Sequence, residues 1–218
     1  MPRLHGNSVL PLFVLFSGVC CQAATILTAN LTNAQEVPPA VPTTSTGAAR
    51  LASFGTAMFV LNDEMNALTM TVTVFNIDFT GSQTPDTNDN LIAAHIHASA
   101  TAAPGVNAPV VWGFFGSPFN DNNPNDVTFT PFATGIGGTI TGKWDAPEGN
   151  STTLTSQLTN ILTGHAYINF HTVQFTGGEV RGFLIATPEP STFGLIGAAF
   201  LCLAGAAIRN RRPRSSRG

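Results

Sequence analysis

The chain of 218 residues contains little charge, because only 10% of its residues are Asp, Glu, Lys or Arg. Most of its positive charge lies at the two ends, so that the stretch 24–186 holds three cations against eleven acids. Proteins that bind nucleic acids contact the phosphates through clustered lysine and arginine. The shortage of positive charge in the body of the chain therefore excludes nucleic-acid binding.

Cysteine is absent from the body as well, since the chain's three cysteines are Cys20, Cys21 and Cys202. A disulfide framework, a thiolate zinc site and a catalytic cysteine are thereby excluded from 24–186. The sequence also lacks a Gly-x-Ser-x-Gly elbow, a P-loop and a dinucleotide fingerprint. Without a nucleophile–base pair, a hydrolase has no support, and a non-enzymatic role is favoured over an enzymatic one.

What the whole chain does contain is typical of strands joined by turns: 28 threonines against one lysine, with 16 Phe, 21 Gly and 15 Pro. Alternating hydrophobic and polar residues predict an all-β antiparallel sandwich or barrel in one domain, 24–186. The predicted strands are 25–31, 47–54, 56–61, 67–77, 91–97, 110–115, 127–130, 138–144, 165–172 and 179–185. Helical spacing of Leu154, Leu158, Ile161 and Leu162 predicts one short helix.

The N-terminus has the pattern of a secretory signal peptide, residues 1–23. A short polar start is followed by the apolar run 9–19 and by small residues that suit cleavage after Ala23. A retained anchor helix is a weaker alternative because the apolar run is shorter than ~20 residues. A lipoprotein attached through Cys20 or Cys21 is another alternative.

The C-terminus, residues 187–218, combines three features. The run 191–208 carries no charge and is long enough to be a candidate membrane helix; five arginines follow it, and Pro188, Glu189 and Pro190 precede it. This order resembles the PEP-CTERM sorting signal of exopolysaccharide-producing Gram-negative bacteria. The resemblance implies recognition by an exosortase, removal of the apolar tail, and delivery to the envelope or outside. Membrane contact would then occur only through the helix 191–208, before processing. A plain single-pass anchor would explain the helix and the arginines but not the Pro-Glu-Pro triplet.

Three segments of the body resemble the CHRD domain, first described in chordin. They are Leu-Thr-Asn-Ala-Gln-Glu-Val-Pro-Pro at 31–39, Ala-His-Ile-His at 94–97 with Pro-Val-Val at 109–111, and Tyr-Ile-Asn-Phe-His-Thr at 167–172 with Gly-Gly-Glu-Val-Arg-Gly at 177–182. The resemblance implies an immunoglobulin-like or Greek-key fold and an extracellular setting, with no established catalytic activity. The sequence departs from the family at 98–101 and in two enlarged loops, 80–90 and 116–126.

Three histidines of these motifs are candidate metal ligands. Because side chains alternate along a strand, His95 and His97 lie on one face of theirs, and His171 lies on the polar face of its own strand. If the two strands are neighbours, the ring nitrogens should converge within about 5 Å. Three imidazoles around an open position suit zinc or copper. His165 lies outside the family motif and is expected to be ordinary.

Other polar residues of the last hairpin are candidates for a supporting shell. Glu179 could orient one ring, Arg181 could attract an anionic ligand, and Asn169 shares the face of His171. A superoxide-dismutase-like sandwich offers a loose parallel, with its His-x-His pair and its late Gly-x-Arg segment. The alternative for the histidines is a solvated or structurally hydrogen-bonded face of an antiparallel sheet. Glu179 and Arg181 could then be an ordinary ion pair.

Two functions follow as hypotheses. The leading one is an exported, non-enzymatic surface or matrix domain, processed by an exosortase and in contact with exopolysaccharide or an envelope protein. The alternative is a histidine-based copper or zinc protein outside the cytoplasm, for which redox activity is a further hypothesis. The loop carboxylates Asp86, Asp89, Asp121 or Asp126 could also form a calcium site, because oxygen ligands suit calcium. The other interpretation of these acids is a solvated acidic loop.

Overall fold

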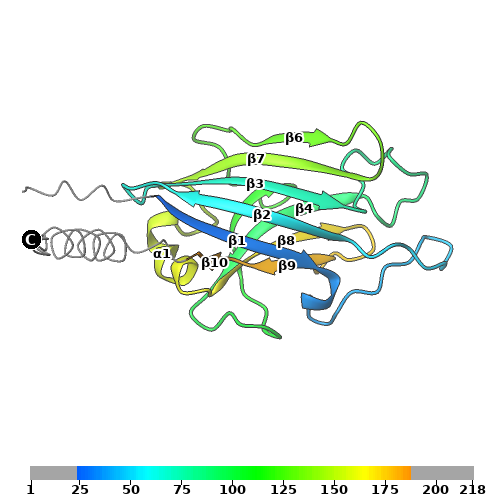
Figure 1. The fold of residues 1–218 in the computed structure, drawn as a ribbon, viewed down its shortest axis with the longest axis horizontal. Helices are drawn as coiled ribbons and strands as arrows, with labels where there is room; N and C mark the ends of the chain where they lie inside the picture. The colour runs from blue at the N-terminus through cyan, green and yellow to red at the C-terminus, as the bar shows by residue number, and fades with distance from the viewer. Residues whose placement is uncertain (1–23, 188–218) are drawn as a thin grey trace, which may run out of the picture.

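A computed structural model describes residues 24–187, which form ten strands, one α-helix and a short 3-10 helix (Figure 1). In chain order the elements are β1 (Thr25–Thr32), η1 (Asn33–Gln35), β2 (Phe54–Leu61), β3 (Ala67–Phe75), β4 (Leu91–Ala98), β5 (Val110–Phe115), β6 (Thr128–Pro131), β7 (Gly137–Asp145), α1 (Leu154–Leu162), β8 (Ala166–Thr172), β9 (Val180–Phe183) and β10 (Ile185–Ala186).

The strands pair antiparallel in the order β5-β4-β8-β9-β1-β2-β3-β7-β6, and β10 pairs with β1. Between β9 and β1 the ladder has a single register pair, Thr32 with Arg181. The sheet curves so strongly that side chains of β5 pack against those of β7 and β6. Trp112 of β5 stacks on Trp144 of β7 with ring centroids 5.6 Å apart, and Phe115 of β5 lies 4.8 Å from Phe129 of β6. The predicted all-β fold is confirmed, and its form is a half-barrel.

Sequence alternation decides which face of each strand is buried. On β1, Leu27, Ala29 and Leu31 lie in the core, while the residues between them are exposed or half-buried. The same period of two holds through β2, β3 and β7. On β8, by contrast, every residue is buried. This strand is therefore covered on both faces, and its second face carries the polar residues considered below.

The helix α1 lies where its apolar spacing predicts it. Thr153 caps its N-terminus by accepting a hydrogen bond from the backbone N–H of Ser156, whose own side chain bonds back to the N–H of Thr153. This reciprocal capping box satisfies two backbone donors that a helix end otherwise leaves free. Leu154 and Ile161 bury the apolar side of the helix in the core.

The predicted strand 47–54 is wrong. Only an isolated bridge, Thr43 with Ala49, forms before β2 begins at Phe54. The Thr44 hydroxyl accepts from the N–H of Ala48, and Gly47 has a φ of +87°, so a turn interrupts the extended backbone. The segment then brings Arg50 to the last hairpin, where its guanidinium binds Glu179.

The predicted signal peptide and the predicted apolar helix 191–208 lie outside the described residues. Among residues 24–187, no helix is long and apolar enough to cross a membrane. The chain enters the domain at β1 and leaves it beside the same strand, where the N–H of Thr187 donates to the carbonyl of Ile26.

Candidate metal centre

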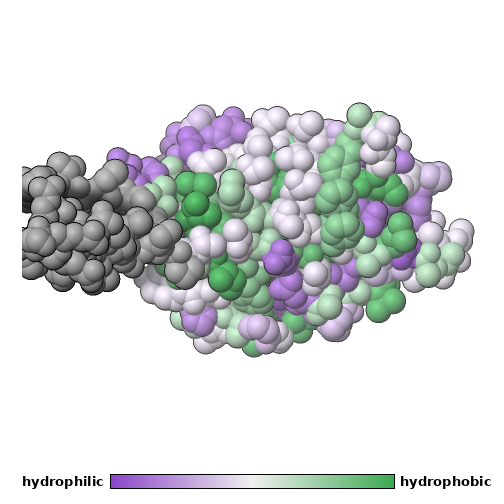
Figure 2. Space-filling model, viewed as in Figure 1, coloured by the Kyte–Doolittle hydropathy of each residue, from purple (hydrophilic) through white to green (hydrophobic). Residues whose placement is uncertain are grey.

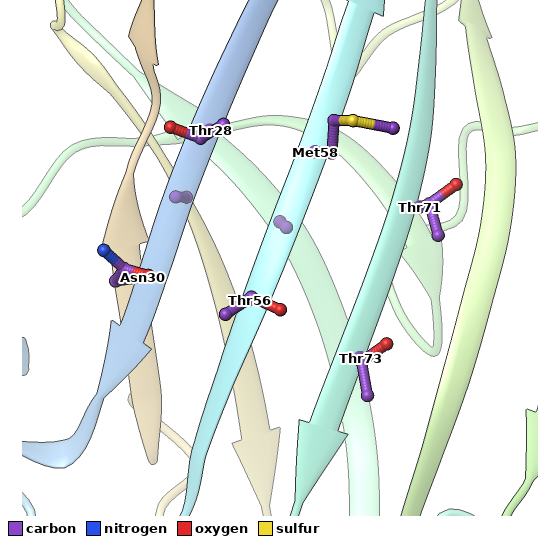
Figure 3. A pocket seen from close by; sticks show the side chains of 8 residues that line it. Thr28, Asn30, Thr56, Met58, Thr71 and Thr73 are labelled. Carbon is purple, nitrogen blue, oxygen red and sulfur yellow. The ribbon is translucent and has the colours of Figure 1, made fainter.

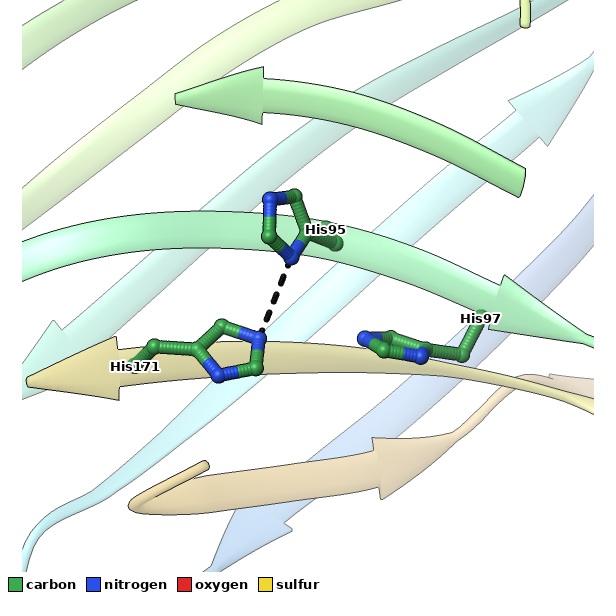
Figure 4. Close-up of side chains that lie close together, drawn as sticks. All are labelled: His95, His97 and His171. Carbon is green, nitrogen blue, oxygen red and sulfur yellow. Dashed lines mark hydrogen bonds between the residues drawn. The ribbon is translucent and has the colours of Figure 1, made fainter. Parts of the chain in front are cut away.

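His95, His97 and His171 lie together on one face of the sheet, where β4 and β8 are antiparallel neighbours (Figure 4). In the register His95 faces Asn169 and Ala93 faces His171, so His171 stands diagonally across from His95. Each ring offers one nitrogen, and these three atoms lie within 4.8 Å of one another. The nitrogens Nδ1 of His95 and Nε2 of His171 are 3.1 Å apart.

The apolar residues between the histidines fix this orientation. Ala94 and Ile96 on β4, and Ile168 and Phe170 on β8, are completely buried in the core. Because side chains alternate across a strand, burying these residues on one face directs all three imidazoles to the other. Because β4 and β8 are also paired, the three rings lie together.

The face that carries the histidines is covered, so a solvated sheet face is wrong, whereas each of the three rings does make a hydrogen bond. His95, His97 and His171 are only 4%, 8% and 7% exposed. One covering segment follows β5, since a Cβ placed on Gly113 would lie 1.8 Å from the Pro118 carbonyl oxygen and 3.1 Å from Cδ2 of His95. This close packing encloses His95 and requires glycine at 113.

Backbone carbonyls set the protonation of two rings. Nδ1 of His97 donates to the Ala108 carbonyl at 2.8 Å, and Nδ1 of His171 donates to the Thr176 carbonyl at 3.0 Å. Since a carbonyl can only accept, Nδ1 carries the hydrogen in both rings and the neutral ring presents a bare lone pair at Nε2. Fixing a ligand ring through its other nitrogen is the usual support for a histidine that binds metal.

The bare nitrogens fit a metal ion better than they fit the protein around them. Nε2 of His97 is buried and finds no hydrogen-bond partner within the described part of the chain. Such an unpaired buried group is costly. Nδ1 of His95 hydrogen-bonds Nε2 of His171 at 3.1 Å, and this separation is close to the ~3.3 Å expected between two ligands of a tetrahedral ion with bonds of ~2.0–2.1 Å, so an ion could replace the shared hydrogen. The cluster could therefore hold a metal ion.

Burial also keeps these rings neutral. Desolvation, followed by the nearby His171, lowers the pKa of His95 from 6.5 to about 4. Desolvation lowers the pKa of His97 from 6.5 to about 3, with smaller contributions from His171, His95 and Arg181. The pKa of His171 is lowered first by burial and then by Arg181. Neutral imidazole is the form that binds metals.

This burial predicts acid sensitivity of the metal-free protein. The pKa values of His95, His97 and His171 are lowered from 6.5 in the folded protein, so in the window from pH 6.5 down to about 3 the unfolded chain binds more protons. Stability is therefore fully present above pH 6.5 and falls as the pH decreases, by ~1.4 kcal/mol for each unit of pKa shift traversed. Urea unfolding midpoints between pH 7 and 5 measure the slope. His97→Ala should flatten it, and an unchanged slope in that variant would contradict the assignment.

Arg181 forms a buried support beside the cluster. Its Nε donates to one carboxylate oxygen of Glu36 at 2.8 Å, its Nη2 lies 2.7 Å from the same oxygen, and its Nη2 donates to Asn107. Its Cζ lies 4.4 Å from the centroid of the Tyr167 ring, which stacks in turn on His97 at 4.8 Å. The roles of Glu36 and Asn107 were not predicted from the sequence; the signal for Glu36 was an acid within the motif at 31–39.

Glu179 does not support the histidines and does not pair with Arg181, so both expectations are wrong. Its carboxylate accepts hydrogen bonds from Arg50, Ser53 and Thr172, and it is completely buried. Asn169 is also buried, beside the Gly178 turn, and its Oδ1 makes no hydrogen bond within residues 24–187. His165 lies apart from the cluster and its Nδ1 donates to the Ala102 carbonyl.

The loop acids do not form the calcium site considered above. Within residues 24–187, the three histidines are the one group of three or more His, Cys, Asp or Glu close enough to hold an ion. Asp86 and Asp89 instead accept hydrogen bonds from Ser45 and Thr84. One oxygen of Asp121 accepts from the backbone N–H groups of Asp126 and Val127.

The described residues thus define a curved antiparallel β domain with a buried trihistidine cluster on one covered face. The chain belongs to the CHRD family, because the CHRD domain model matches residues 27–184. The model of the PEP-CTERM protein-sorting motif matches residues 186–212. This motif implies export, processing by an exosortase and sorting to the cell envelope. No curated protein and no solved structure matches the chain.

Proposed function

We propose that this is an exported envelope protein whose β domain, residues 24–186, binds one copper or zinc ion through His95, His97 and His171. The observation that carries the proposal is the convergence of three neutral, buried imidazoles within 4.8 Å. Two of the rings are fixed by backbone carbonyls that leave Nε2 free. A set of three histidine ligands is established protein chemistry for zinc, and imidazole suits copper equally.

The metal content of the exported protein tests the proposal. Protein purified from the cell envelope without chelators should contain about one copper or zinc per chain by elemental analysis, as one three-ligand centre requires. Protein stripped with a chelator should take up the same amount when either metal is returned. A protein that is metal-free as isolated and still takes up no stoichiometric metal would refute the function.

A second candidate is the surface domain without a metal, and the outer face of β1, β2 and β3 favours it. Threonine, asparagine and methionine side chains project from this face and line a shallow depression: Thr28, Asn30, Thr56, Met58, Thr71 and Thr73 (Figure 3). The space-filling view shows large areas of intermediate hydropathy with scattered apolar groups (Figure 2). Such an uncharged, hydroxyl-rich surface suits contact with polysaccharide. Exopolysaccharide that copurifies with metal-free protein would favour this candidate.

A further inference from the structure

We infer that the trihistidine cluster stabilises copper as Cu(I) relative to Cu(II), an inference that rests on the proposed metal-binding function. The described groups around the three rings provide no negative charge to offset that of a bound ion. Every hydrogen-bond partner that fixes the rings is neutral: the Ala108 and Thr176 carbonyls hold His97 and His171, and His95 contacts His171. No carboxylate takes part among the described residues.

The carboxylates that the sequence places on this face are engaged elsewhere. Glu179 binds Arg50, Ser53 and Thr172, and Glu36 is paired with Arg181. Divalent metal sites commonly gain from a carboxylate that supports a ligand histidine, because its negative charge offsets that of the ion. Here that compensation is missing from the described shell around all three rings.

The charged side chain that packs toward the rings is a cation. Arg181, which is paired with Glu36, lies against the Tyr167 ring, and that ring stacks on His97. The positive charge of Arg181, reduced by that of Glu36, opposes a metal ion held between the histidines, and it opposes a doubly charged ion twice as strongly as a singly charged one.

Burial and ligand number act in the same direction. The cost of moving an ion out of water rises with the square of its charge, so it is about four times larger for a dication than for a monocation of equal size. The three rings are at most 8% exposed. Cu(II) also prefers tetragonal sites with more ligands than the three that converge here. The site therefore lowers the free energy of Cu(I) relative to that of Cu(II).

The reduction potential of the copper-loaded protein tests this inference. In the one-electron step Cu(II) + e⁻ → Cu(I), the electron comes from an electrode or a redox titrant. We expect a preference for Cu(I) of at least tenfold over aqueous copper ion, which raises the one-electron potential by ~59 mV or more. A potential at or below that of the aqueous couple would overturn the inference and leave metal binding intact. Failure to bind copper or zinc would instead overturn the proposed function, and the inference with it.

A pair of variants isolates the role of Arg181. The double variant Glu36→Gln/Arg181→Met removes the ion pair, whose cationic member packs against the Tyr167 ring beside His97, and should therefore lower the potential. Arg181→Lys keeps the charge and should keep the potential within a few millivolts of wild type if it folds. Loss of packing alone would weaken the binding of both copper states, measured with a Cu(I) and a Cu(II) chelator. An unchanged potential in the double variant, with copper still bound, would show that Arg181 does not set the preference.

Discussion

His97→Ala is expected to lower the affinity for copper and zinc by at least about 100-fold, since loss of a supporting residue alone typically costs 10–100-fold. The substitution leaves two ligand rings, too few for the three-histidine centre that suits zinc. It also removes the ring whose Nε2 has no hydrogen-bond partner in the described chain. Competition with a chromogenic chelator, together with the metal content of the purified variant, measures the effect.

His165→Ala is the matched control. His165 directly precedes β8, but it donates to the Ala102 carbonyl and contributes nothing to the trihistidine cluster. Its removal should leave affinity and stoichiometry unchanged, while circular dichroism confirms that both variants are folded. Stoichiometric, undiminished binding in His97→Ala, or equal losses in the two variants, would contradict the assigned site.

The histidine cluster could be predicted because it depends on a local rule. Strand alternation places His95 and His97 on one face, and Ile168 and Phe170 of the next strand direct His171 to the same side. The one further assumption was that the two strands are neighbours. Most of the strands were predictable for the same reason, because the alternation of hydrophobic and polar residues shows which face of a strand packs in the core.

The surroundings of the cluster could not be predicted, because they depend on pairings between distant segments. Glu36 and Arg181 are separated by 145 positions, and only the assembled fold brings them together. The loops before and after β5 cover the polar face, and no periodic pattern in the sequence predicts the path of a loop. The prediction of a strand at 47–54 was wrong because the alternation of hydrophobic and polar residues does not predict the turn at Thr44 or the positive φ of Gly47.

Arg181→Met should destabilise the protein by about 3–5 kcal/mol, the usual cost of leaving one member of a buried ion pair without its partner. Glu36 is 3% exposed and Arg181 is 1% exposed, so neither side chain can turn to water for compensation. Burial already raises the pKa of Glu36 against the opposing effect of Arg181, and losing the arginine removes that opposition. Urea unfolding at pH 7 measures the change.

Glu36→Gln/Arg181→Met separates the ion pair from the packing around it. Removing both charges avoids the isolated buried carboxylate, so the double variant should lose clearly less stability than Arg181→Met. The difference between the double change and the sum of the single changes gives the coupling of the two residues. Strict additivity would show that the 2.7 Å contact contributes packing but no electrostatic coupling. Strong coupling would mean that the acid of the 31–39 motif holds Arg181 against Tyr167, and through that ring helps to hold His97 in place.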